Sequence, residues 1–254
     1  MSKLPHIGTS IFTVMSQMAT EHNAINLSQG FPNFPVDKRL IDIFARLASE
    51  NVHQYSPMSG YPPLLEKIAK LTQQSYRRIV NNKSEILITA GATEGIFAAI
   101  QALVNANEEV IILDPSYDCY EAPILLSNAK PIRVPLNDDF TPNWENINAA
   151  TNENTKLIII NNPHNPTGKT WTSADFDQLE KLVESFSNLI VFSDEVHSRK
   201  SGNEITTSSK SPVYPDFFCL KRSVTFRTSI IETVAFTYFW AMPKVRETFF
   251  HLHR

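Results

Sequence analysis

Short apolar runs alternate with amphipathic stretches through the middle of the chain. Five apolar runs mostly lack the polar alternation of a half-solvated strand, and they span residues 85–90, 110–114, 131–136, 157–161 and 189–193. Between them, apolar residues recur at helical spacing over residues 94–104, 117–127 and 173–186. Strands that alternate with helices predict an α/β fold, in which a mostly parallel sheet is connected by right-handed crossovers and covered on both faces.

Residues 1–50 follow a different pattern, with prolines and a polar run. They predict an N-terminal arm and part of a small domain, followed by a large domain over residues 51–254 that is incomplete after about residue 197.

The chemical character of the chain excludes several classes of partner. A net charge of -3 and scattered lysines and arginines argue against nucleic-acid binding. No window approaches the roughly 18 consecutive apolar residues of a membrane span. Cys119 and Cys219 form no metal-binding or redox motif, and the N-terminus lacks the pattern of a secretion signal. We therefore expect a cytoplasmic protein with reduced thiols and without a metal.

Ligands of open α/β sheets bind beyond the carboxyl ends of the strands, so the residues after each apolar run are candidates. Gly91, Ala92 and Thr93 follow the first run at the start of a predicted helix, where free N–H groups favour a phosphate. A glycine turn with Thr93 as the helix cap would explain the same residues. Tyr117 follows the second run, and it suits either a ring at the sheet rim or core packing.

Two later strand ends carry further candidate chemistry. Residues 161–168 form a polar turn in which two prolines fix the backbone and Asn165 can donate inward. Turns use these residue types anyway, but so long a specific string indicates a function. Asp194 follows the last run and places an acid at the same rim, although an acid at a strand end is often simply solvated.

Taken together and in this order, six strings resemble those of the class I/II, fold-type I aminotransferases, most closely the methionine and kynurenine branch. The strings are residues 26–32, 53–60, 91–93, 114–117, 165–168 and 193–196. The resemblance implies a three-layer α/β sandwich, the cofactor pyridoxal 5'-phosphate and a cytoplasmic homodimer. It also implies transfer of an amino group from an amino acid, such as methionine or an aromatic amino acid, to a 2-oxo acid.

The resemblance assigns a role to each rim residue. Gly91, Ala92 and Thr93 are implied to hold the cofactor phosphate, and Tyr117 to stack on the cofactor ring. Asn165 is implied to donate to the phenolic oxygen of the ring.

Three further residues complete the implied site. Asp194 is implied to pair with the pyridine nitrogen, because an adjacent carboxylate raises the pKa of that nitrogen and keeps it protonated. Tyr55 is implied to reach the phosphate bound by the other subunit, and Gly30 to lie beside the substrate carboxylate.

The chain departs from the family pattern where the family carries the lysine that is covalently attached to the cofactor. Thr228 occupies that position, 34 residues beyond Asp194 (228 minus 194). Lys221 and Lys244 are the nearest lysines, but neither has the neighbouring string, and each is expected on the surface. No catalytic residue is therefore assigned.

Other departures follow Asp194. The family has a tyrosine where this chain has His197, and the pattern is lost over residues 198–209 and 227–240, which suggests frame disturbances or drift. The sequence ends at Arg254, from which we expect a missing C-terminal domain. The alternative to an active aminotransferase is therefore a catalytically dead remnant or a cofactor-binding scaffold.

Two rival nucleotide sites are weaker. Residues 167–170 end like a phosphate-binding P-loop, but Pro163 stands where that loop requires glycine. No G-x-G-x-x-G string follows a predicted strand, so a nicotinamide-dependent oxidoreductase has support from the fold class alone.

Overall fold

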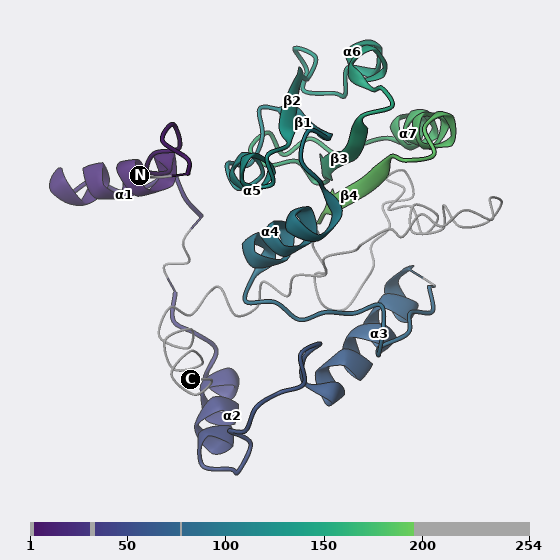
Figure 1. Cartoon of the computed structure of the whole chain (residues 1–254). Coiled ribbons are helices and arrows are strands. Elements are labelled where there is room, and N and C mark those ends of the chain that lie inside the picture. The colour runs from purple at the N-terminus through teal and green to yellow at the C-terminus, as the bar shows by residue number, and fades with distance from the viewer. Residues whose placement is uncertain (1–2, 31–33, 77, 196–254) are drawn as a thin grey trace. The chain divides into compact units, whose positions relative to one another are not determined.

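The computed structural model describes residues 3–30, 34–76 and 78–195 (Figure 1). The chain divides into two compact units between Pro57 and Met58. None of the helices in the described part is long and apolar enough to cross a membrane.

The N-terminal unit contains two helices that are stabilised by local capping. They are α1 (Ile11–Glu21) and α2 (Lys38–Ala48). The Ser10 side chain accepts from the backbone N–H of Thr13, and the Asp37 side chain accepts from that of Arg39. Neither helix contains a buried residue, so local contacts such as these caps contribute directly to their stability.

The second unit is built on a parallel sheet of four strands in the order β2-β1-β3-β4. The strands are β1 (Glu109–Asp114), β2 (Lys130–Pro135), β3 (Thr155–Asn161) and β4 (Ile190–Asp194). Four of the five predicted strands are thus confirmed. The apolar runs of β1, β3 and β4 are nearly continuous because helices cover the sheet on both sides, whereas β2 lies at an edge and is only partly buried.

Four helices of this unit form the two outer layers of a three-layer sandwich (Figure 1). On one face, α4 (Ala92–Leu103) and α5 (Glu121–Leu126) share a buried cluster with Val110 and Ile112 of β1. On the other face, α6 (Trp144–Ala150) and α7 (Ser173–Ser185) share a cluster with Ile111 and Leu113. This alternation along one strand confirms the predicted α/β sandwich.

The strand predicted over residues 85–90 is wrong for the described chain. Ile86 and Ile88 pack instead with Leu65 and Ile68 of α3 (Pro62–Tyr76). The N–H of Ile88 donates to the carbonyl of Ser59, and the intervening Leu87 is 54% exposed. The apolar side chains of this run pack on α3, and the Ile88 N–H bonds a turn residue instead of a neighbouring strand. Among the described residues, the run therefore joins no sheet.

One predicted helix begins later than expected, and one short helix was missed. The helix predicted from residue 117 begins only at Glu121, because Tyr117–Tyr120 lies in a loop and turn after β1. Helix α6 was not predicted, since it is short and only Ile147 of its residues is buried.

Candidate functional site

Three strands end in polar side chains at one edge of the sheet. Asn161 of β3 lies opposite Asp194 of β4 in the ladder. Ile112 of β1 lies opposite Ile159 of β3, which brings the last residue of β1, Asp114, to the same edge two residues later. The carboxyl ends of β1, β3 and β4 therefore form one polar rim.

The Asp194 carboxylate is buried, with 7% of the residue exposed, and is held by a tyrosine from the loop after β1. The Tyr120 hydroxyl donates to Asp194 Oδ2 at 2.6 Å. Burial raises the pKa of Tyr120, and the neighbouring Asp194 charge adds to the rise, so the hydroxyl stays protonated and remains a donor. The sequence placed an acid at this rim without showing that it is buried.

Tyr120 also joins Asp194 to the predicted ring-stacking residue. The rings of Tyr117 and Tyr120 lie edge to face, with centroids 6.0 Å apart and planes at 77°. Burial raises the pKa of Tyr117, and a hydrogen bond with the Thr93 side chain opposes that rise. Contacts thus run without interruption from Thr93 through both tyrosines to Asp194.

Thr93 belongs to the start of α4, which has the features of an anion site. Gly91 is the N-cap with φ of +101°, and no side chain caps the helix there. The first N–H groups of a helix have no partner within it, and the positive end of the helix dipole adds to their attraction for an anion. Thr93 is therefore not the helix cap, and the capping explanation of residues 91–93 is wrong.

The turn that contains Asn165 is tied to Asp194 through Asn161. Asn161 Nδ2 donates to the backbone carbonyl of Asp194 at 2.9 Å, and Asn161 Oδ1 accepts from the backbone N–H of Asn165. The N–H of Asn162 donates to the same Asp194 carbonyl at 3.1 Å. The turn and the aspartate thus share one buried amide, which fixes them relative to each other.

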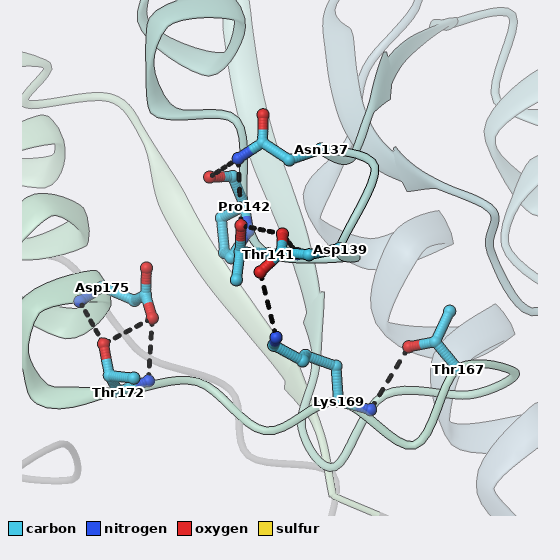
Figure 2. A network of polar contacts seen from close by, with 8 residues as sticks. All are labelled: Asn137, Asp139, Thr141, Pro142, Thr167, Lys169, Thr172 and Asp175. Carbon is cyan, nitrogen blue, oxygen red and sulfur yellow. Dashed lines mark hydrogen bonds and ion pairs between the residues drawn. The ribbon is translucent and has the colours of Figure 1, made fainter.

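The rest of the turn is fixed by its own residues and by the loop after β2. The His164 ring is buried, and its Nδ1 forms a hydrogen bond with Thr167 Oγ1 at 2.8 Å. The N–H of Gly168, whose φ is +72°, donates to the His164 carbonyl. Figure 2 shows Lys169 between Thr167 and Asp139, to which its Nζ donates at 3.1 Å. The turn is therefore supported on its inner and outer sides.

The structure brings together the predicted phosphate, ring, amide and acid residues of the second unit. Gly30 and Tyr55 belong to the N-terminal unit, where Tyr55 is 84% exposed, and their roles remain predictions. His197 and Thr228 lie outside the described residues.

Sequence reasoning missed Tyr120, Asn161 and His164 as members of the site. A signal existed for Tyr120, because it follows Tyr117 by three residues directly after a strand end. Asn161 and His164 were read as turn residues, although their side chains make the contacts that hold the turn in place.

Comparisons with known proteins identify the group to which this arrangement belongs. The family model of aminotransferase class I and II matches residues 22–210. Methionine aminotransferase of Escherichia coli (strain K12) is 44% identical over 197 residues, which cover 77% of this chain and 51% of that protein. Kynurenine–oxoglutarate transaminase of Dictyostelium discoideum is 33% identical over 208 residues, covering 75% and 48%.

Solved structures give the same result. Escherichia coli YbdL, identified as a methionine aminotransferase, matches with a TM-score of 0.73 at 44% identity and covers 77% of this chain and 51% of that chain. N-succinyldiaminopimelate aminotransferase of Mycobacterium tuberculosis matches with a TM-score of 0.73 at 32% identity, covering 78% and 54%. The chain spans about half the length of the curated relatives it matches.

Proposed function

This chain belongs to the aminotransferase class I and II family, and we propose that the rim of its second unit binds pyridoxal 5'-phosphate for amino-group transfer. The observation that carries the proposal is the unbroken series of contacts from Thr93 through Tyr117 and Tyr120 to Asp194, and on through Asn161 to the turn of Asn165.

The described residues fit the chemical features of this cofactor. Gly91, Ala92 and Thr93 offer an uncapped helix start to the phosphate. Tyr117 supplies an aromatic ring, and the buried Asp194 supplies an anion for the ring nitrogen. When bound, the cofactor supplies a ring that accepts electrons from the substrate, and Asp194 holds the proton of the ring nitrogen that this chemistry requires.

The proposed reaction transfers an amino group from an amino acid to a 2-oxo acid. The names of the relatives make methionine and kynurenine the first donors to test. The proposal includes Asn165 as the donor to the phenolic oxygen, Gly30 beside the substrate carboxylate, and Tyr55 acting across a homodimer. It also places the protein in the cytoplasm, where the free thiol of Cys119 would stay reduced.

A second function has one observation in its favour. Thr228 stands at the position of the family's cofactor-attaching lysine, and a threonine hydroxyl cannot form an imine. A chain without that lysine would bind the cofactor noncovalently and serve as a scaffold.

The experiment titrates the purified full chain with pyridoxal phosphate and records the absorbance spectrum before and after borohydride reduction. Mass spectrometry of the peptides then locates any reduced adduct. Saturable binding that is weakened by Asp194→Asn, but not by the control Asp118→Asn at an exposed aspartate of the turn after β1, supports the site. A reduced adduct on a lysine, with amino transfer from methionine or kynurenine, supports the enzyme. Saturable binding without adduct or transfer supports the scaffold, and absence of binding by the folded chain contradicts both.

A further inference from the structure

Tyr120 touches two residues of the proposed cofactor site from a fully buried position. Only 2% of it is exposed, and its ring packs in the cluster formed by α4, α5 and one face of the sheet. Its hydroxyl donates to Asp194 Oδ2 at 2.6 Å, while its ring meets that of Tyr117 edge to face. One side chain therefore contacts both the acid and the aromatic ring of the site.

We propose that Tyr120 is a positioning residue, whose hydroxyl fixes the Asp194 carboxylate for the cofactor's ring nitrogen, while its ring sets the orientation of Tyr117. This inference rests on the proposed function and adds a residue that the sequence did not assign.

The physical reason is the cost of burying a carboxylate. A charge in a low-dielectric site is retained when a strong donor replaces lost water, and hydrogen bonds to a charged acceptor are among the strongest in proteins. The backbone of Asp194 is already held by Asn161 and Asn162, which leaves the carboxylate to its own donors. The short bond from Tyr120 is such a donor contact to the carboxylate itself.

Two ligands separate this role from a general structural one. Pyridoxal phosphate has a ring nitrogen and a phosphate, whereas benzyl phosphate has a ring and a phosphate but no nitrogen. Tyr120→Phe removes the hydroxyl and retains the ring against Tyr117. In the full chain, we expect it to weaken pyridoxal phosphate binding by about tenfold or more and to leave benzyl phosphate binding unchanged. The absorbance spectrum of the bound cofactor should also change, because the carboxylate beside the ring nitrogen is no longer held in place.

A control and a double-mutant cycle complete the test. Tyr61→Phe removes a hydroxyl from a tyrosine that is 58% exposed, and it should leave both affinities unchanged. In an Asp194→Asn background, Tyr120→Phe should have no further effect on pyridoxal phosphate binding, because the hydroxyl acts through the charge. If Tyr120→Phe is unfolded by circular dichroism, Tyr120→Met removes both the hydroxyl and the ring, and it should weaken pyridoxal phosphate binding more than benzyl phosphate binding.

Three outcomes would overturn the inference. They are unchanged pyridoxal phosphate affinity in Tyr120→Phe, equal weakening of both ligands, and an undiminished effect of the substitution in the Asp194→Asn background. If the unaltered chain binds neither ligand, the proposed function fails as well, and this result is distinct because it appears before any substitution is made.

Discussion

At the scale of single residues, Asn161 connects the end of β4 to the turn that contains Asn165. Its amide nitrogen donates to the carbonyl of Asp194, and its amide oxygen accepts from the N–H of Asn165. Asn161 is buried, so its amide bonds are shielded from water and are costly to lose. The residue couples the position of the turn to the position of the acid.

Replacing Asn161 by alanine should therefore destabilise the fold. The Asp194 carbonyl keeps the Asn162 N–H, but the Asn165 N–H loses its acceptor, so we expect a loss of about 1–3 kcal/mol in the free energy of unfolding. Urea denaturation followed by circular dichroism measures this loss. The control is Asn148→Ala in α6, where the exposed amide bonds only the Trp144 carbonyl, with an expected change within about 0.5 kcal/mol. Equal effects of the two substitutions would contradict the assignment.

His164 gives the rim a dependence on pH. Burial lowers the pKa of His164 below its ordinary value of 6.5, and a hydrogen bond with the backbone of Pro115 opposes part of that shift. The unfolded chain therefore binds more protons than the folded chain just below this value, and folding stability falls as the pH falls. Above it, both states are neutral and the contribution of His164 is fully present.

We expect the free energy of unfolding to decrease between about pH 7 and pH 5, and His164→Gln to flatten that slope. Urea denaturation at each pH supplies the data. His53→Gln, a change at an exposed histidine, should retain the slope of the unaltered chain. A slope that survives in His164→Gln would show that other groups cause the dependence.

At the scale of elements, α7 is attached to α6 through its capping box. Thr172 and Asp175 each accept a hydrogen bond from the other's backbone, as Figure 2 shows, and Asp175 Oδ1 also accepts from Trp144 Nε1 at 3.0 Å. Asp175 therefore closes the helix start and holds the neighbouring helix, whereas Thr172 only caps.

This difference predicts an order of stability losses. Thr172→Ala should lower the free energy of unfolding by about 1 kcal/mol, the usual value of an N-cap. Asp175→Ala should lower it by about 2 kcal/mol, because the half-buried hydrogen bond from Trp144 is lost as well. Thermal and urea unfolding would rank the variants. Asp177→Ala, two residues along the same helix and exposed, should change stability by less than about 0.5 kcal/mol. The reverse order of the first two variants would show that Trp144 contributes nothing.

The elements also show how far the sequence could predict this molecule. The strands ending at Asp114, Asn161 and Asp194 were predictable, because continuous apolar runs report burial on both faces, and parallel strands bring their ends together. The run at residues 85–90 has the same local pattern but packs on α3, which no local pattern distinguishes. The bond from Tyr120 to Asp194 joins residues 74 positions apart, so only the folded arrangement reveals it.

At the scale of the whole molecule, the chain consists of two units with different internal support. The second unit has helices on both faces of a sheet, whereas α1 and α2 of the first bury no residue. At the boundary of the two units, residues 51–58 form neither helix nor strand, and all are exposed. Such an exposed segment is where proteases cut first.

Chymotrypsin should therefore cut the described part of the chain first after Tyr55, close to the proposed division between residues 1–50 and 51–254. Tyr120 and the other buried aromatic residues should resist, and Tyr55→Ser should remove the first cut.

If Tyr55 reaches a cofactor phosphate across a homodimer, added pyridoxal phosphate should slow the cut several-fold, whereas pyridoxal, which lacks the phosphate, should not. Mass spectrometry of the early fragments measures both effects. Equal rates with both ligands would remove Tyr55 from the proposed site, and a first cut inside the sheet would show that the second unit opens before the linker is reached.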